Sequence, residues 1–265
     1  MHYRKNLLSG EWVLLSGTAP QHHPDVDSPD IYQHYSASAY EQYFSDGNTV
    51  PLIGLSHTEL YDYFRAYAAW ITNALNNCRD IMIHSIIKPS CTLKGTERES
   101  HLTIVPDHPD FLDRCIESVH ERYEDKHICP LCEVICAEIE YNQRVISQTE
   151  RFVAFCPFFQ RFPYETLIAP LAHSPHFSGI SDEMLHEFSL ICHDLFNRIY
   201  DETNKTDFSI HLHHIFVPVQ FHYCTHWYLD IIPRTANWAG FEIATGININ
   251  TTVPEHCVKN LSKIN

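Results

Sequence analysis

The chain has 265 residues, of which 44% are hydrophobic and 19% are charged, with 8 Gly and 15 Pro. This composition excludes disordered, collagen-like and low-complexity proteins, and the length suits one large domain or two of roughly 130 residues each. Its 18 basic and 33 acidic side chains give a net charge of −15, which disfavours nucleic-acid binding because a phosphate backbone would be repelled. The unusual counts are 20 His and 10 Cys, which raise the question of a metal site.

The sequence shows no targeting or membrane segment. Residues 1–12 are basic but lack the apolar stretch of a signal peptide, and no apolar run approaches the ~18 residues of a membrane-spanning helix. We therefore expect a cytoplasmic protein with no membrane partner. Cysteines are mostly reduced in that compartment, so the many cysteines indicate core packing plus a metal site rather than a disulfide scaffold.

The first half of the chain is expected to mix short strands with two helices. Ser56-His57-Thr58-Glu59 is a capping box, and apolar residues recur behind it at helical spacing. The stretch 17–50 shows no steady periodicity and is interpreted as a loop, with the acidic and aromatic run Tyr32–Phe44 at the surface. In chain order, the expected elements are a hairpin at 3–16, the loop at 17–50, a helix at 57–77, a strand at Ile81–Ile87 and a helix opening at Pro109-Asp110.

From Lys126 onward the pattern is denser. Ser181 is a favourable helix cap, and the acidic Asp182 and Glu183 suit the positive end of the helix that follows. Strands that are adjacent in sequence, with helices between them, favour an α+β fold with a mainly antiparallel sheet. The expected elements are helices at Cys132–Tyr141 and Ser181–Tyr200, strands at Arg151–Cys156, Glu165–Pro170, Asp207–Val217 and His222–Ile232, and a final tail.

The motif with the clearest chemistry is Cys129-Pro130-Leu131-Cys132. Two thiolates at this spacing can approach one metal ion from a tight turn, whereas a redox pair or two packed cysteines are the alternatives. A zinc site would need two more ligands, and histidine is the obvious type. Spacing alone does not choose among the histidines, and any single one is more often a surface or core residue. The candidates are His127, His173, His176, His211, His213, His214, His222 and His226.

Several longer motifs follow one another in a recognisable order. They are Cys129–Cys132, Phe152–Phe158, Arg161–Glu165, Ile168–Pro170, His173, Phe177, Thr225–Leu229, Ile232–Arg234 and Gly240–Asn250. Over about residues 126–258 the chain resembles the C-terminal half of galactose-1-phosphate uridylyltransferase and of the related ADP-glucose phosphorylase, which belong to the histidine-triad superfamily. Leu8–Leu14 also resembles the opening strand of that family.

The resemblance implies two tandem histidine-triad-like repeats, each a curved antiparallel sheet with packed helices. Residues 1–125 would form a shortened first repeat and residues 126–265 the second. In the phosphorylase-like branch, the second repeat carries a zinc ion on a Cys-x-x-Cys pair and two histidines, in a closed tetrahedral and therefore structural site. The matching positions in this chain are Cys129, Cys132, His173 and His226.

The uridylyltransferase branch implies a different metal site in the same repeat. That site would use Glu138, His213 and His226, all of which this chain contains. Because Tyr228 replaces the further histidine of that branch, we rank this version second.

The catalytic centre is where the resemblance fails. Family enzymes attack the α-phosphorus of a nucleotide sugar with the second His of a His-Pro-His motif, because imidazole is nucleophilic while neutral and leaves again readily. Counting back from the strand Leu102–Pro106, this motif falls on Glu97-Arg98-Glu99. Glu99 thus stands at the nucleophile position, where its carboxylate would repel a diphosphate. His101 lies two residues away and is the nearby candidate for a displaced nucleophile.

Other family features of the first repeat are also replaced. No cysteine occurs before Cys78, the expected phosphate-binding arginines correspond to Ala19–His23, and the Asn- and Gly-rich approach to the motif corresponds to Ile86–Ser90. Cationic donors and open backbone are what a diphosphate site needs. Their joint replacement disfavours the family's standard reaction.

By comparison, the segment Gly240–Asn250 matches the family pattern well. The resemblance gives Glu242 a sugar-contacting role, with Phe241 packing nearby. The alternative is that the two glycines of this segment shape a turn and that Glu242 is solvated.

Two functional hypotheses follow. The first is an enzyme of galactose metabolism, a hexose-1-phosphate nucleotidyltransferase or nucleotide-sugar phosphorylase with an impaired active site. The second is a pseudoenzyme, a catalytically inactive zinc-stabilised relative that binds a nucleotide sugar, a sugar phosphate or a protein partner. The resemblance also implies that a homodimer can form.

Overall fold

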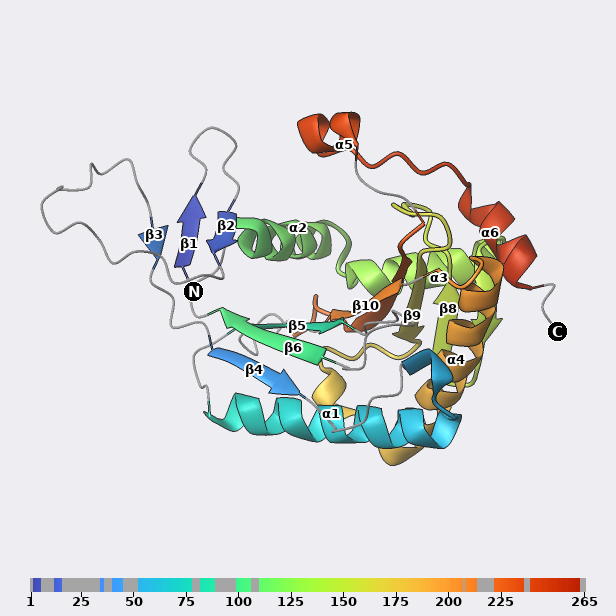
Figure 1. The fold of residues 1–265 in the computed structure, drawn as a ribbon, viewed down its shortest axis with the longest axis horizontal. Coiled ribbons are helices and arrows are strands. Elements are labelled where there is room, and N and C mark those ends of the chain that lie inside the picture. Colours follow the sequence, from blue (N-terminus) through green and yellow to red (C-terminus); the bar gives the residue numbers. More distant parts are fainter. Residues whose placement is uncertain are drawn as a thin grey trace, which may run out of the picture.

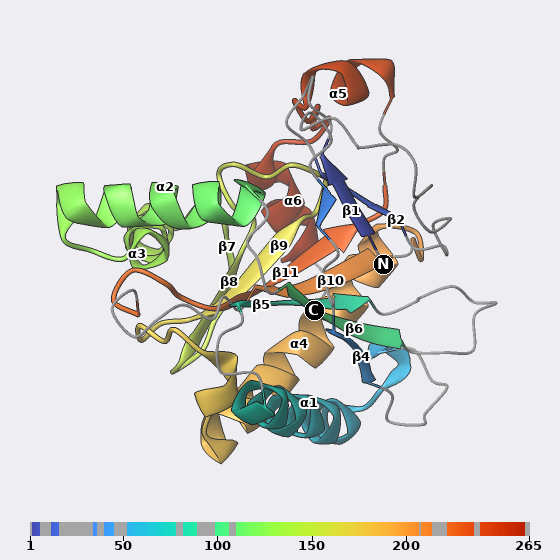
Figure 2. The ribbon, with the colours of Figure 1, turned by 90° about the vertical axis from the view of Figure 1, so that its left-hand side faces the viewer.

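The computed structural model describes residues 2–5, 12–15, 34–35, 40–44, 52–77, 82–88, 99–105, 110–206, 208–213, 222–235 and 239–262. These residues contain three antiparallel sheets with helices packed around them (Figures 1 and 2). Among them, no helix is both long and apolar enough to cross a membrane.

The largest sheet has five antiparallel strands in the order β10-β11-β9-β8-β7. The strands are β7 (Val145–Gln148), β8 (Phe152–Phe155), β9 (Thr166–Pro170), β10 (Phe208–His213) and β11 (Tyr228–Pro233). Every residue of β8 and β9 is buried, because helices cover the sheet on both faces. In β10, buried apolar residues alternate with partly exposed ones, as expected when successive side chains point to opposite faces.

One face of this sheet carries the main core, beneath α4 (Asp182–Glu202) and α1 (His57–Asn77). Aromatic side chains fill its centre, and Trp227 lies with ring-centroid distances of 5.0 Å to Phe177 and 5.5 Å to Phe188. The opposite face is covered by α3 (Pro130–Tyr141). The residues of this second core are Ile135, Val153, Phe155, Leu167 and Ala169.

The first half of the chain contributes two smaller sheets. One has the order β4-β6-β5 and the other the order β2-β1-β3. Strand β5 lies alongside β10, which brings the β4-β6-β5 sheet next to the five-stranded sheet (Figure 1). The strands are β1 (His2–Lys5), β2 (Trp12–Leu15), β3 (His34–Tyr35), β4 (Tyr40–Phe44), β5 (Met82–Lys88) and β6 (Glu99–Val105).

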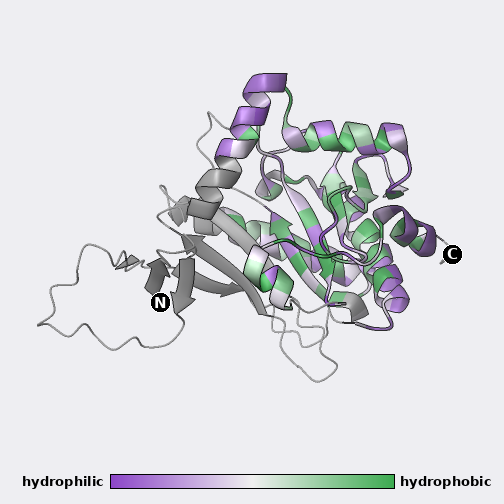
Figure 3. Cartoon of the chain, turned by 90° about the horizontal axis from the view of Figure 1, so that it is seen from above, coloured by the Kyte–Doolittle hydropathy of each residue, from purple (hydrophilic) through white to green (hydrophobic). Residues whose placement is uncertain are grey.

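The remaining elements lie around this frame. Helix α2 (Asp110–Lys126) packs on α3, and its last turns are exposed and hydrophilic (Figure 3). Helix α5 (Gly240–Thr245) stands away from the sheet, while α6 (Pro254–Leu261) packs against α4 and β7 (Figure 1). The described residues also include short 3-10 helices at Leu52–Gly54 and Phe177–Gly179.

The structure confirms most of the predicted elements and corrects several. The helix at 57–77 is confirmed, and the helix predicted from Pro109-Asp110 begins at Asp110. The loop assigned to 17–50 is wrong in part, because His34–Tyr35 pairs with β1 and Tyr40–Phe44 pairs with β6 as strands. The other residues of this stretch lie outside the described residues. The final tail contains two helices that were not predicted, α5 and α6. The strand expected to begin at His222 begins instead at Tyr228.

Helix α4 begins with the cap that the sequence predicts. The Ser181 hydroxyl accepts a hydrogen bond from the Met184 amide at 3.3 Å. We expect Ser181→Ala to lower the free energy of unfolding by about 1 kcal/mol, because that amide loses its acceptor. Ser181→Asp restores an acceptor and should leave the stability near that of the wild type. Denaturant unfolding of both variants measures the difference, and equal losses would contradict the capping role.

Candidate metal centre

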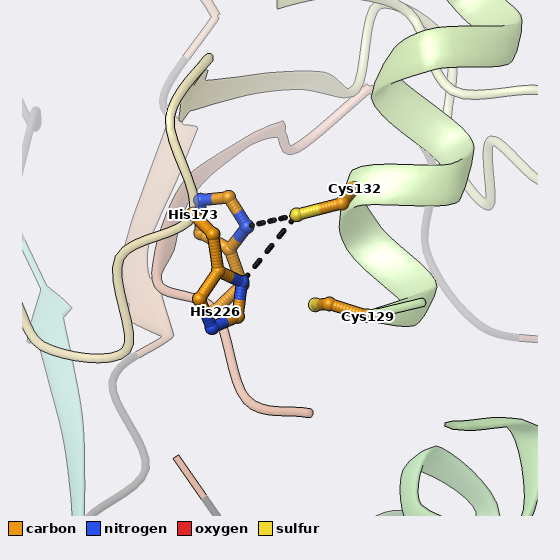
Figure 4. Close-up of side chains that lie close together, drawn as sticks. All are labelled: Cys129, Cys132, His173 and His226. Atoms are coloured by element: carbon orange, nitrogen blue, oxygen red, sulfur yellow. Dashed lines mark hydrogen bonds between the residues drawn. The ribbon is translucent and has the colours of Figure 1, made fainter. Parts of the chain in front are cut away.

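Four side chains converge where the start of α3 meets two loops of the large sheet (Figure 4). The donor atoms of Cys129, Cys132, His173 and His226 all lie within 4.8 Å of one another. The Nδ1 atoms of His173 and His226 are 3.4 and 3.3 Å from the Cys132 sulfur. Among the described residues, this is the one group of three or more such side chains placed to hold a metal ion.

The start of α3 positions both thiols. Cys129 occupies the N-cap, and Pro130 takes the first helical position, where a missing N–H costs nothing. The Glu133 amide then closes the first turn on the Cys129 carbonyl at 2.9 Å. This turn carries Cys132 back to the same side as Cys129 (Figure 4).

The two histidines lie on loops that the aromatic core holds together. His226 precedes Trp227, whose backbone amide donates to the Ser174 carbonyl at 3.0 Å and whose indole N–H donates to the Ser174 hydroxyl at 3.1 Å. Ser174 follows His173 in the chain. The buried Trp227 therefore joins the loop after β9 to the turn before β11, and with them the two imidazoles.

Hydrogen bonding fixes which nitrogen of His173 can bind a metal. Its Nε2 atom lies 2.9 Å from the His222 carbonyl, and a carbonyl can only accept, so Nε2 carries the proton. The lone pair is then on Nδ1, which faces Cys132. Such partners of a metal-binding histidine orient the ring and raise its basicity. The Nε2 atom of His226 is buried and has no hydrogen-bond partner in the part of the chain that the structure describes.

The electrostatics favour one preformed thiolate. A hydrogen bond from Cys132, with further help from His226, lowers the pKa of Cys129 to about 4. The same contact raises the pKa of Cys132, whose thiol is the donor. Thiolates are the form that binds metals, and they are stabilised near a helix N-terminus. The site thus offers a thiolate, a second thiol and two imidazole nitrogens.

The second-ranked metal set is not brought together. Glu138 is buried and accepts two hydrogen bonds from Arg144, at 2.8 and 3.1 Å. His213 stacks on Tyr228 with a centroid distance of 4.3 Å, while His226 faces Cys132. The metal site expected from the uridylyltransferase branch is therefore wrong for this chain, because the Arg144 guanidinium holds the Glu138 carboxylate that the metal would need.

The other candidate histidines have different surroundings. His176 and His222 lie with their Nε2 atoms 3.0 Å apart, and His211 is 6.2 Å from His213, centroid to centroid. His127 is exposed. His214 lies outside the described residues.

The predicted catalytic positions fall on β6. Glu99 opens this strand opposite Lys88 of β5, and His101 pairs with Ile86 and with Tyr43 of β4. Side chains alternate along a strand, so Glu99 and His101 belong to the same face. Glu97 lies outside the described residues.

The predicted sugar-contacting residues lie on α5. The Glu242 carboxylate accepts a hydrogen bond from the Ala239 amide at 3.1 Å and so closes the first turn of its own helix. Gly246 ends the helix with φ +70°, a conformation that glycine adopts at low cost. Phe241 is 49% exposed. Within this chain, Glu242 therefore has a local structural partner.

The sequence did not predict a buried ionic network that joins Arg161 and Glu165 to Asp230 of β11. The Arg161 guanidinium donates to Glu165 at 2.6 Å and to Asp230 at 2.6 Å, and both carboxylates are almost completely buried. Burial raises the pKa of Asp230 to about 6, against the opposing effect of Arg161, and raises that of Glu165. The motif Arg161–Glu165 was a signal for this network, but only the fold brings Asp230 to it.

His176 gives the stability of the fold a dependence on pH. Burial, together with the imidazole of His222, lowers the pKa of His176 from 6.5 to about 4. A group with a depressed native pKa stays neutral in the fold while the unfolded chain takes up the proton, so stability falls as the pH drops below 6.5. Between pH 7 and pH 5 this loss is about 2 kcal/mol.

His176→Gln should remove that part of the pH dependence. Denaturant unfolding at pH 7 and pH 5 measures it, with His256→Gln as the control because His256 is exposed on α6. An equal acid loss in wild type and His176→Gln would contradict the assignment.

The fold is shared with solved structures. A solved uridylyltransferase mutant matches this chain with a TM-score of 0.81 at 18% identity, over 99% of this chain and 98% of that one. The fold is that of the uridylyltransferases, which confirms the predicted α+β architecture of helices on antiparallel sheets.

The sequence comparisons point to the same proteins. No protein-family model matches the chain. ADP-glucose phosphorylase of Arabidopsis thaliana is 27% identical over 168 residues, which are 62% of this chain but only 46% of that protein. Galactose-1-phosphate uridylyltransferase of Thermotoga maritima is 27% identical over 240 residues, 83% of this chain and 71% of that protein. The predicted resemblance is confirmed: the relatives of this chain are uridylyltransferase-like and ADP-glucose phosphorylase proteins.

Proposed function

We propose that this protein recognises a nucleotide sugar or a sugar phosphate, as a zinc-stabilised relative of the hexose-1-phosphate nucleotidyltransferases. The observation that carries the proposal is the Cys-x-x-Cys and two-histidine cluster in a chain whose relatives are a uridylyltransferase and a phosphorylase of nucleotide sugars. Because the chain spans about half of the phosphorylase, its activity and substrates are part of the proposal.

The donor set of the cluster fits zinc. Zinc prefers four tetrahedral ligands, with sulfur at about 2.3 Å and nitrogen at about 2.0–2.1 Å, so each sulfur and nitrogen should be about 3.6 Å apart. The two sulfur–nitrogen distances at Cys132, 3.4 and 3.3 Å, are close to this value. Four protein ligands leave no open position, so the ion would supply folding stability and no Lewis-acid chemistry.

The chemistry of the first repeat decides between two versions of this function. Nucleotidyl transfer needs a nucleophile on β6, where Glu99 occupies the expected position and His101 the same face two residues on. Binding without transfer is the second candidate, and the carboxylate of Glu99 favours it, because it would repel the diphosphate and is no substitute for an imidazole. Glu242 and Phe241 on α5 are proposed to contribute to sugar recognition.

Intact mass spectrometry separates the two versions. The protein is incubated with UDP-glucose and, separately, with ADP-glucose, and then with a hexose 1-phosphate. A nucleotidyl adduct that appears with the sugar nucleotide and disappears with the sugar phosphate supports transfer. His101→Asn should abolish the adduct, whereas His256→Asn, at an exposed position of α6, should not.

Titration calorimetry tests recognition itself. Saturable binding of either sugar nucleotide, without an adduct, supports the inactive version. The absence of both an adduct and binding would contradict the proposed function as a whole.

Two further expectations belong to this proposal. The first is a homodimer, which sedimentation at several protein concentrations tests. A cytoplasmic location is tested by fractionation of cells that produce the protein.

A further inference from the structure

Two further histidines contact each other beside the metal centre. The Nε2 atoms of His176 and His222 are 3.0 Å apart, and their rings meet edge to face with centroids 4.3 Å apart. At this distance one nitrogen donates a hydrogen bond and the other accepts it. Neither side chain is one of the four proposed metal ligands, so the contact adds nothing to the ligand set itself.

The main chain of His222 connects this contact to a metal ligand. Its carbonyl oxygen lies 2.9 Å from Nε2 of His173 and accepts a hydrogen bond from that nitrogen. The ring of His173 then turns its Nδ1 atom toward Cys132 (Figure 4). Because the side chain and the carbonyl belong to one residue, a shift of the His222 side chain also moves the acceptor that orients His173.

His176 is held in place from its own side of the contact. It precedes the 3-10 helix Phe177–Gly179 with extended backbone, and its carbonyl accepts a hydrogen bond from the Ser174 hydroxyl at 3.4 Å. The next residue, Phe177, is completely buried and packs edge to face on Trp227 at a centroid distance of 5.0 Å. The main core thus fixes His176, and His176 in turn contacts His222.

The turn that contains His222 has other supports as well. Tyr223 packs on Tyr123 of α2 with a centroid distance of 4.2 Å. Further along the same segment, Trp227 is hydrogen-bonded to Ser174 through its amide and its indole. These contacts do not involve the His176 side chain. Loss of that side chain should therefore displace the His222 carbonyl without unfolding the turn.

We propose that His176 is a positioning residue of the metal centre, which acts through His222 to hold His173 in the orientation that binds zinc; this role rests on the zinc site proposed above. Loss of a partner that orients a ligand histidine typically weakens metal binding by about 10- to 100-fold. His176 stands one step further from the ion, so its effect belongs at the lower end of that range, at about 10-fold.

Metal affinity and ligand geometry are the two quantities that test this role. The zinc-loaded full-length protein is equilibrated with a chromogenic chelator at about pH 7.5, where imidazoles are ordinarily neutral. We expect His176→Leu to hold zinc about 10-fold more weakly than the wild type. Cobalt(II) accepts the same sulfur and nitrogen ligands, and its visible absorption reports their arrangement, so the cobalt spectrum of His176→Leu should also shift.

Three further variants separate positioning from packing. His176→Gln keeps an amide that can reach the His222 ring, so it should recover most of the affinity and the wild-type cobalt spectrum. His222→Leu should weaken binding as much as His176→Leu, and the double variant should be no worse than either, because both substitutions remove the same contact. His256→Leu is the control and should bind as the wild type does, since His256 is exposed on α6.

Two results would overturn the role of His176. One is a His176→Leu protein that is less stable but keeps the wild-type zinc affinity and cobalt spectrum, because the side chain then contributes packing alone. The other is a double variant whose loss equals the product of the two single losses, because His176 then acts independently of His222. Failure of the wild type to bind either metal is distinct from both, since it contradicts the zinc centre itself and this role with it.

Discussion

Replacing Cys129 with serine should abolish zinc binding and destabilise the second half of the chain. Serine oxygen is a poor zinc ligand at neutral pH, and three remaining ligands leave the site open. A ligand that binds only the folded state stabilises it by about 4 kcal/mol when its free concentration is 1,000 times its dissociation constant. We therefore expect a loss of about 4 kcal/mol when zinc is in such excess, and a fall in metal content from about one ion per chain to near zero.

The control comes from the same helix. Cys136 lies one turn beyond Cys132 and is exposed, so Cys136→Ser should keep both the zinc and the stability. Elemental analysis gives the metal content, and denaturant unfolding with and without a chelator gives the stability. Full zinc retention in Cys129→Ser, or equal effects of the two substitutions, would contradict the site.

The sequence was sufficient for those parts of the fold that local chemistry specifies. The helix at 57–77 follows from its capping box, and α4 follows from Ser181 and the apolar spacing behind it. Strand β4 was missed because its partner β6 is distant in sequence, and nothing within Tyr40–Phe44 reveals that pairing. Helix α6 was missed because it is only eight residues long, which is too short for a convincing periodicity.

The candidate site shows the same division between local and distant information. The spacing of Cys129 and Cys132 by itself indicates a pair of metal ligands, because both thiols lie on one turn. Their partners lie on two other loops, so spacing could not choose His173 and His226 from eight candidates. The resemblance named them, and the fold brings them to the cysteines through the packing of Trp227 against Ser174.

The ionic network around Arg161 is beyond sequence reasoning for a related reason. Arg161 and Glu165 are close in the chain, yet Asp230 is on β11, and its burial depends on how that strand packs. Nothing in an isolated Asp indicates that its carboxylate will be 1% exposed. The cost of burying two acidic groups beside one cation appears only in three dimensions.

Removal of that cation should be among the most damaging single substitutions in the sheet. Arg161→Met keeps most of the side-chain volume but leaves Glu165 and Asp230 as buried carboxylates without their counter-charge. Breaking a buried ion pair in this way costs about 3–5 kcal/mol. Denaturant unfolding at pH 7 should show a loss of that size. Arg198→Met removes a pair with Asp194 on α4, whose carboxylate side chain is 43% exposed, so it should cost less than about 1 kcal/mol.

The dependence on pH gives this expectation a second, independent check. Without Arg161 the native pKa values of both carboxyl groups rise further above their unfolded values, so the folded variant binds more protons than the unfolded chain. The loss in free energy of unfolding of Arg161→Met relative to the wild type should therefore shrink as the pH falls from 7 to 5. The lower pH lies below the wild-type Asp230 pKa of about 6. Adding Glu165→Gln and Asp230→Asn to Arg161→Met should recover most of the loss at pH 7, because no buried charge then remains. A deficit that is independent of pH, or no recovery in the triple variant, would assign the loss to packing of the Arg161 side chain instead of its charge.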